Sequence, residues 1–284
     1  MAECHVCFHH CKLSEGKRGR CLARICRDGA VVPANYGMVT ALALDPIEKK
    51  PLSGFFPGSM ILSVGSYGCN LSCRFCQNHE IAHPPVGVDY TPAVGMREMT
   101  PEELVSAAKR AQRDGNIGLA FTYNEPLVGY EFVRDTAKRI KEAGMRTVLV
   151  TNGTAELPVL EELLPWIDAM NIDLKGFTER FYTEMAGGSL AMTKAFLEKA
   201  AAHCHVEVTT LIIPGENDTE SEMEALTDYL AGLNGGAGKE IPLHITRFFP
   251  RYHLTDRGPT PVETVYRLCE TARKKMTYVY AGNV

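Results

Sequence analysis

The sequence contains no long hydrophobic run, no large excess of charge and no internal repeat. Its apolar stretches all fall short of the roughly 18 residues that a membrane-spanning helix needs, and the N-terminal segment MAECHVCFHHCK lacks the apolar core of a signal peptide. A net charge of −4 at pH 7 indicates neither a nucleic-acid-binding surface nor a membrane-binding one. We therefore expect a cytoplasmic protein that has no membrane partner.

Cysteine, by contrast, is plentiful, and seven of the ten cysteines gather in two short clusters. The first cluster comprises Cys4, Cys7, Cys11 and Cys21, and the second comprises Cys69, Cys73 and Cys76. Such clusters suggest disulfides in a small secreted domain but metal sites in a cytosolic protein. We therefore interpret both clusters as metal-binding.

The second cluster has the spacing CxxxCxxC. A [4Fe–4S] cluster normally takes four cysteine ligands, so three thiolates can hold three irons and leave the fourth iron open for chemistry. The alternative is half of a zinc site, with His79 as the missing ligand. The spacing, the aromatic Phe75 before the last cysteine and the position after the first strand of a βα series favour the iron–sulfur cluster.

From Met60 onward, β-type runs alternate with helical patterns. This alternation predicts parallel strands with crossover helices, and six or seven such units favour an α/β fold of the partial (β/α)6, TIM-like barrel type. We expect a Cys-rich metal-binding element at 1–29, a strand-containing lead-in at 30–58 and the barrel at 59–284. In such barrels the chemistry lies at the carboxyl ends of the strands. The Pro/Gly-rich stretch 83–95, just after the second cluster, is a candidate lid.

A CxxxCxxC motif after the first strand of a partial barrel resembles the radical S-adenosylmethionine (SAM) superfamily. The resemblance implies that the amino and carboxylate groups of SAM chelate the open iron. It further implies that an injected electron cleaves SAM to a 5′-deoxyadenosyl radical, which abstracts hydrogen from a substrate. It also implies flavodoxin or ferredoxin as the electron donor.

Polar motifs end consecutive strands where SAM would need them: TYNEP at 122–126, TNG at 151–153 and DLK at 173–175. The candidate SAM-binding residues are Phe75, Asn124, Glu125, Thr151, Asn152, Asp173, Lys175 and His244. Among them, Glu125 suits the SAM ammonium and Lys175 the SAM carboxylate. Singly, each motif has an ordinary alternative as a helix start, a capped turn or a surface ion pair.

A longer series of motifs narrows the family. DPIEKKPL, FFPG, GCNLSCRFCQN, FTYNEP and YAGNV together resemble the radical SAM enzymes of the AmmeMemoRadiSam system, which implies AMMECR-family and Memo-family proteins as partners. DLK and the PG turn also resemble pyruvate formate-lyase activating enzymes. Members of the former family usually continue past YAGNV into a tail with a CPxC pair, which this sequence, ending at Val284, does not contain.

The first cysteine cluster suits either structural zinc or an auxiliary iron–sulfur cluster, because both accept four thiolates. We favour zinc here, since no other feature of the sequence demands a further electron carrier. Basic residues around these cysteines either compensate thiolate charge or attract an acidic partner.

The sequence thus predicts a radical SAM enzyme acting on an unidentified protein, RNA or small molecule. A glycyl-radical-enzyme activase is the first alternative, and a non-catalytic metal-binding interaction module is the second.

Overall fold

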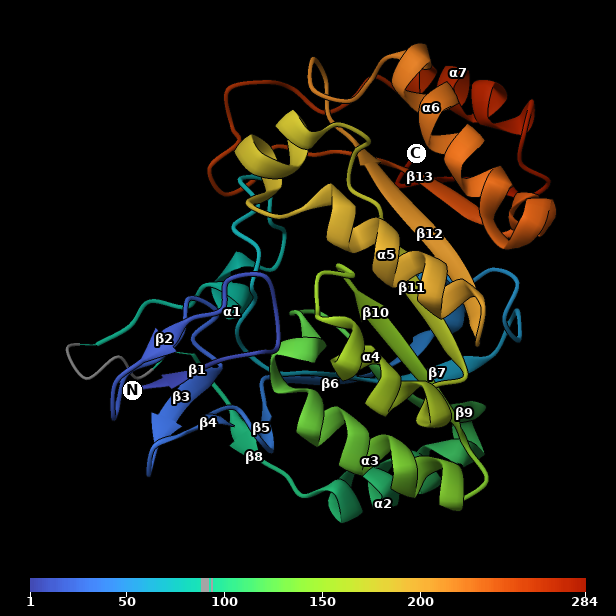
Figure 1. Ribbon diagram of the computed structural model, residues 1–284. Coiled ribbons are helices and arrows are strands. Elements are labelled where there is room, and N and C mark those ends of the chain that lie inside the picture. Colours follow the sequence, from blue (N-terminus) through green and yellow to red (C-terminus); the bar gives the residue numbers. More distant parts are fainter. Residues whose placement is uncertain (88–91, 93) are drawn as a thin grey trace.

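A curved sheet of eight strands forms the centre of the molecule (Figure 1). The structure is a computed structural model that describes residues 1–87, 92 and 94–284. Within these residues the strand order is β14-β13-β12-β11-β10-β9-β7-β6, and every pairing is parallel except that of β6 with β7. Strands β14 and β6 are the two edges, so the barrel is open. The predicted partial barrel is confirmed.

The strands of this sheet are β6 (Ala41–Pro46), β7 (Met60–Gly65), β9 (Asn116–Phe121), β10 (Arg146–Thr151), β11 (Ala169–Asp173), β12 (His205–Ile212), β13 (Leu243–Arg247) and β14 (Val279–Gly282). The helices around it are α2 (Pro101–Ala111), α3 (Tyr130–Glu142), α4 (Leu157–Leu163), α5 (Leu190–Ala201), α6 (Glu220–Gly232) and α7 (Val262–Arg273). A short α1 (His79–Ala82) follows the second cysteine cluster, and a π-helical turn, η5 (Phe181–Ala186), precedes α5.

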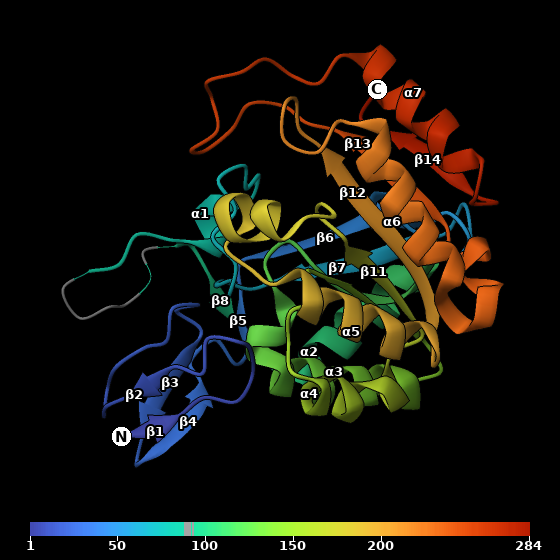
Figure 2. The ribbon, with the colours of Figure 1, turned by 45° about the horizontal axis from the view of Figure 1, so that its top comes forward.

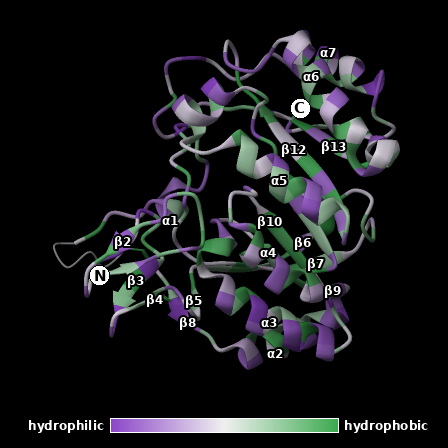
Figure 3. Ribbon diagram, in the orientation of Figure 1, coloured by the Kyte–Doolittle hydropathy of each residue, from purple (hydrophilic) through white to green (hydrophobic). Residues whose placement is uncertain are grey.

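Alternation along the strands separates two apolar layers, because successive side chains of a strand point to opposite faces. In β7, Leu62 packs in the large core with the helices, whereas Ile61 packs inside the barrel against Leu52. Figure 3 shows the sheet strands largely hydrophobic and the outer faces of the helices largely hydrophilic. The segment 47–55, which we call the plug, therefore fills the barrel interior.

A small Cys-rich element lies beside the barrel (Figure 2). It contains two antiparallel pairs, β1 (Ala2–Glu3) with β2 (Lys12–Leu13), and β3 (Arg24–Arg27) with β4 (Ala30–Pro33). The β3–β4 hairpin runs across the boundary expected at residue 29. The lead-in is divided as well: β5 (Met38–Val39) pairs with β8 (Arg97–Glu98), and β6 joins the barrel sheet.

Direct contacts fix the Cys-rich element to the barrel. Cys7 forms an isolated β-bridge with Ala155, and the Glu156 N–H donates to the carbonyl of Val6 at 2.9 Å. Arg24 pairs with Glu131 of α3 at 2.7 Å, and the Arg24 side chain is only 6% exposed. The element therefore covers the barrel at the carboxyl ends of β7, β9 and β10.

Residues 88–91 and 93 lie outside the described part of the chain, and the predicted lid at 83–95 falls largely on them. No helix in the described residues combines the length and apolar character needed to cross a membrane.

Candidate iron–sulfur and cofactor site

The second cysteine cluster lies in the loop that follows β7. The Ser72 N–H donates to the carbonyl of Ala186, and the Arg74 N–H to that of Met185, so the end of the π-helical turn holds this loop. Burial raises the pKa of Cys69 well above its usual range and that of Cys73 to about 11. Such thiols ionise when a metal takes the place of the proton, so one buried and two half-buried thiols in one loop fit the expected cluster.

Glu125 joins the ends of β9 and β10. Its Oε1 accepts from the Leu127 N–H at 3.0 Å and from the Thr151 hydroxyl at 2.7 Å, and its Oε2 accepts from the Asn152 N–H at 2.7 Å. Burial raises the pKa of Glu125 to about 7, although these three hydrogen bonds oppose the rise. A carboxylate has about four acceptor positions, so one remains for a ligand ammonium.

Asn152 connects this carboxylate to the cysteine loop. Its amide nitrogen lies 3.8 Å from Sγ of Cys69 and 2.9 Å from Oδ1 of Asn70. Its Oδ1 accepts from the Thr154 N–H at 3.0 Å, which fixes the amide orientation. Thr151 and Asn152 therefore lie beside Glu125 and Cys69, and their contact with SAM stays a prediction.

Asp173 and Lys175 end β11 on the other side of the cysteine loop. The Lys175 ammonium lies 2.8 Å from the Asp173 carboxylate. Although burial lowers the pKa of Lys175, the charges of Asp173 and Cys73 raise it well above the usual range. A permanently protonated lysine next to two of the three thiols suits a carboxylate bound at an open iron.

The Asn124 side chain binds backbone groups of the loop before Cys69. Its amide nitrogen donates to the carbonyls of Tyr67, Gly68 and Glu125, and its Oδ1 accepts from the Ser66 N–H. Asn124 therefore positions the loop that carries Cys69, and its direct contact with SAM stays a prediction.

His244 departs from the prediction. Its Nε2 lies 2.6 Å from Oε2 of Glu207, whose carboxylate also binds His205 and accepts from the N–H groups of Ser53 and Gly54. The structure thus places His244 in a buried network with the plug, instead of at the cofactor. Through Glu207 the His244 side chain is linked to the plug, and the sequence gives no sign that the plug occupies this space.

Phe75 is buried in the core, with its ring 6.0 Å from that of Phe181. Its contact with SAM stays a prediction.

The sequence does not predict two further features of the site. Tyr123 has a left-handed backbone (φ 75°), and its hydroxyl donates to Asp45 at 2.9 Å beside the buried Lys50. Separately, the His253 N–H donates to the carbonyl of Arg74, and the neighbouring Tyr252 ring stacks on that of His79 at 4.6 Å. The unusual backbone of Tyr123 and the long-range pairing of 252–253 leave no local pattern in the sequence.

Comparison with known proteins agrees with this geometry. The model of the Radical SAM superfamily matches residues 63–230. This chain belongs to the radical SAM superfamily. It is 40% identical to the uncharacterized protein MJ0808 of Methanocaldococcus jannaschii, over 99% of this chain and 81% of that protein. It is 27% identical to the pyruvate formate-lyase 1-activating enzyme of Escherichia coli K12, over 62% of this chain and 71% of that enzyme.

Solved radical SAM structures share the fold. A domain of a pyruvate-formate lyase-activating enzyme from Bacteroides vulgatus superposes with a TM-score of 0.50 at 21% identity, covering 58% of this chain and 99% of that one. SuiB of Streptococcus suis bound to S-adenosylmethionine gives a TM-score of 0.57 at 13% identity, covering 77% of this chain and 48% of that one. As a radical SAM enzyme, this chain uses a [4Fe–4S] cluster and cleaves SAM reductively.

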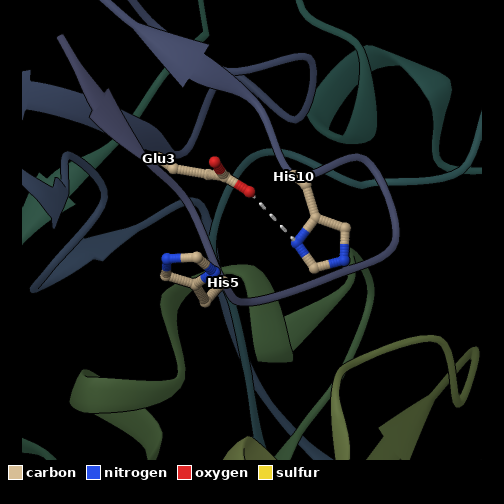
Figure 4. A group of neighbouring side chains, drawn as sticks. All are labelled: Glu3, His5 and His10. Atoms are coloured by element: carbon tan, nitrogen blue, oxygen red, sulfur yellow. Dashed lines mark ion pairs between the residues drawn. The ribbon is translucent and has the colours of Figure 1, made fainter.

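The four cysteines of the first cluster also lie together in the structure. All four of its thiols, Cys4, Cys7, Cys11 and Cys21, line one cavity of the Cys-rich element. His5 and His10 do not join them. They lie instead with Glu3 in an exposed group, the only three potential ligands within 4.8 Å of one another in the described part of the chain (Figure 4).

Proposed function

We propose that Cys69, Cys73 and Cys76 hold the catalytic [4Fe–4S] cluster and that Glu125, Asp173 and Lys175 orient SAM on its open iron. The observation that carries this proposal is the convergence of a carboxylate and a protonated lysine on the same three thiols. Asn152 touches Cys69 from one side, and the charge of Lys175 acts on Cys73 from the other. When bound, the [4Fe–4S] cluster with SAM would supply the reductive cleavage of SAM and the radical abstraction of hydrogen from the substrate.

The roles of the protein residues follow from their contacts. Glu125 has one free acceptor position for the SAM ammonium, while Lys175 pairs with the SAM carboxylate at the expense of its bond to Asp173. Asp173, released from that bond, is then available to the ribose hydroxyls. Thr151 and Asn152 hold Glu125 ionised by donating to it.

Anaerobic reconstitution tests this proposal. The protein with iron, sulfide, SAM and dithionite should yield 5′-deoxyadenosine, and Cys69→Ala should abolish that product. Cys269→Ala is the matched control, because Cys269 is a buried thiol of α7 outside both clusters. If the wild type yields no 5′-deoxyadenosine, the chain is a non-catalytic metal-binding module instead.

The substrate is the open part of the proposal. A glycyl-radical enzyme is a second candidate, because relatives include the pyruvate formate-lyase 1-activating enzyme and the benzylsuccinate synthase activating enzyme of Thauera aromatica. Incubation with a glycyl-radical enzyme should then produce a glycyl-radical EPR doublet and oxygen-dependent cleavage of its backbone. An unchanged target with continuing SAM cleavage would favour RNA or a small molecule.

The remaining assignments are also proposals. Flavodoxin or ferredoxin suits as the electron donor, and AMMECR-family and Memo-family proteins as partners. A cytoplasmic location is supported by ten cysteines without a disulfide. A second metal at the first cysteine cluster is supported by the shared cavity of its four thiols.

A further inference from the structure

The first cysteine cluster forms a metal-binding set with its own geometry. Its four thiols face one cavity, together with His9, Gly19 and the apolar cap of Val128. None of the four forms a disulfide, and three of them are buried. Four thiols around one cavity are the complete donor set of either a zinc ion or a [4Fe–4S] cluster.

The spacing of the sulfur atoms distinguishes the two metals. Zinc binds each thiolate at about 2.3 Å in a tetrahedron, which brings the four sulfurs to about 3.8 Å from one another. Among the described residues, no three of these four sulfurs lie within 4.8 Å of one another. The same is true of Cys69, Cys73 and Cys76. A cubane cluster spreads its thiolates, because each binds a different iron. Neither set is therefore as closely spaced as the sulfurs of a zinc tetrahedron, which disfavours the zinc interpretation made from the sequence.

The residues that flank Cys69 both touch the Cys-rich element. Gly68 has φ +94°, and a Cβ there would overlap the carbonyl oxygen of Cys21. On the other side of Cys69, the carbonyl of Asn70 lies 2.8 Å from Nε2 of His9. The close approach requires glycine at 68. The two cysteine sites are therefore neighbours in space.

A short route connects the two sites. Asn70 is covalently bonded to Cys69, and its carbonyl oxygen lies 2.8 Å from Nε2 of His9, which lines the cavity of the first cluster. Asn152 supports this route by donating to the Asn70 side chain at 2.9 Å while approaching Cys69. The path between the two sites therefore crosses Asn70 and its hydrogen bond to His9. Electron tunnelling falls steeply with distance, so such a path favours transfer between the sites.

The Cys-rich element contains more basic than acidic residues: residues 1–33 hold six Lys and Arg against three Asp and Glu, and Lys12 and Arg20 are exposed. A net positive element attracts an acidic protein and speeds its encounter. The partner that fits is an acidic one-electron carrier.

We infer that Cys4, Cys7, Cys11 and Cys21 hold a second [4Fe–4S] cluster, which passes single electrons from an acidic, low-potential donor protein to the cluster at Cys69, Cys73 and Cys76. In each transfer the donor is oxidised by one electron, the second cluster is reduced and then reoxidised, and the catalytic cluster is reduced. No bond or proton changes place. The identity of the electron acceptor rests on the proposed function.

Metal content tests the first half of this inference. The reconstituted wild type should hold about eight irons, and the Cys4→Ser/Cys7→Ser variant about four. Cys26→Ser is the matched control and should keep all the iron, because Cys26 is a buried thiol of the same element that contacts Glu15 and not the cavity. A zinc ion that is lost only in the Cys4→Ser/Cys7→Ser variant overturns the inference, as does a wild type with only four irons.

Zinc bound at the protein surface has to be distinguished from zinc in the cysteine cavity. The metal content is therefore measured again in a His5→Ala/His10→Ala background, which removes the exposed ligand group of Figure 4. Zinc that disappears with these histidines does not belong to the cysteine cavity.

A comparison of two reductants tests the second half of the inference, the transfer of electrons through the second cluster. With reduced flavodoxin, Cys7→Ser should form 5′-deoxyadenosine about tenfold more slowly than the wild type, whereas with dithionite the two rates should agree within about twofold. Equal rates with flavodoxin overturn the relay. Retention of about four irons and an unchanged circular dichroism spectrum show that the variant is folded.

Failure of the proposed function gives a different result. In that case the wild type makes no 5′-deoxyadenosine with dithionite, while iron at the first cluster is still counted in Cys69→Ala.

Discussion

A single carboxylate, that of Glu125, holds the ends of β9 and β10 together and is the proposed partner of the SAM ammonium. We predict that Glu125→Gln weakens SAM binding by about tenfold or more, because a charge-assisted hydrogen bond to the SAM ammonium is replaced by a neutral one. The amide also turns one N–H toward the N–H of Asn152, which now donates to Oε2. Equilibrium binding of SAM to the reconstituted protein measures the effect.

Glu207→Gln is the matched control, because Glu207 is equally buried but bonds to the plug instead of the cysteine loop. Its SAM affinity should stay within about twofold of the wild type. A Glu125→Gln protein that binds SAM normally would show that Glu125 only ties β9 to β10.

Two adjacent lysines of the DPIEKKPL motif differ in environment. Lys50 is 3% exposed, lies 2.9 Å from Asp45 and covers the Tyr123 ring, whereas the side chain of Lys49 is 68% exposed and lies 3.5 Å from Asp45. We predict that Lys50→Met lowers the free energy of unfolding by about 2–4 kcal/mol, because the partly buried Asp45 then keeps only the Tyr123 hydroxyl and the exposed Lys49 as partners. Lys49→Met should cost less than about 1 kcal/mol.

Urea unfolding of both variants measures this difference. Adding Asp45→Asn to Lys50→Met should recover most of the lost stability, because no uncompensated charge then remains. Equal losses in the two lysine variants would contradict the buried pair.

These lysines show what the sequence can predict at the scale of residues. The proposed ligands Cys69, Cys73 and Cys76 are predicted from their spacing, since local spacing determines whether thiols share a loop. The sequence does not show which of Lys49 and Lys50 is buried, because that depends on Tyr123 arriving from the end of β9. The placement of His244 fails for the same reason.

At the scale of elements, the plug is fixed to the sheet by one buried carboxylate. Burial alone raises the pKa of Glu207, but hydrogen bonds from His205, His244 and the N–H groups of Ser53 and Gly54 lower it to about 2. The unfolded value is near 4.5. The folded protein therefore gains stability from Glu207 above about pH 4.5 and loses it as the pH falls toward 2, amounting to about 3 kcal/mol.

Glu207→Gln should remove this pH dependence. The variant should be less stable than the wild type at pH 6, and the difference should shrink as the pH falls from 4.5 to 2.5, which denaturant unfolding at each pH measures. A difference that stays constant over this range would mean that Glu207 contributes packing and not charge.

The sequence predicts most elements of the barrel because their patterns are local. Strands β7, β9 and β10 contain apolar runs, and helices have their own apolar faces, as α3 does with Phe132 and Ile140. The lead-in is harder to predict, since Pro33 and Gly37 interrupt it and a strand's partner is not written in its own residues. Strand β6 therefore appears in the sequence as a strand, but its place at the edge of the main sheet does not.

At the scale of the whole molecule, the Cys-rich element depends on the barrel for its position. Its apolar residues are few, and Cys21 and Ala23 form a small separate cluster with Val128 of the barrel. Docking on the barrel, together with the proposed metal, therefore supplies most of the order that an element of this size cannot gain from its own core. The sequence identifies the element but not its docking, because Arg24 and Glu131 lie 107 positions apart.

The Arg24–Glu131 pair is the strongest charged link between the two parts, with both carboxylate oxygens within 2.8 Å of Nη1 and the Arg24 side chain 6% exposed. We predict that Arg24→Met loosens the element by about 3 kcal/mol, because the partly buried Glu131 loses its partner. Amide hydrogen exchange in 1–33 should then speed up, while exchange in the barrel strands stays unchanged. Arg27→Met, at an exposed position of the same strand β3, is the control and should change neither.

If the inferred relay operates, Arg24→Met also forms 5′-deoxyadenosine more slowly with flavodoxin as the reductant, but not with dithionite. If amide exchange in 1–33 speeds up but product formation with flavodoxin does not slow down, docking of the Cys-rich element stabilises the structure without affecting electron transfer.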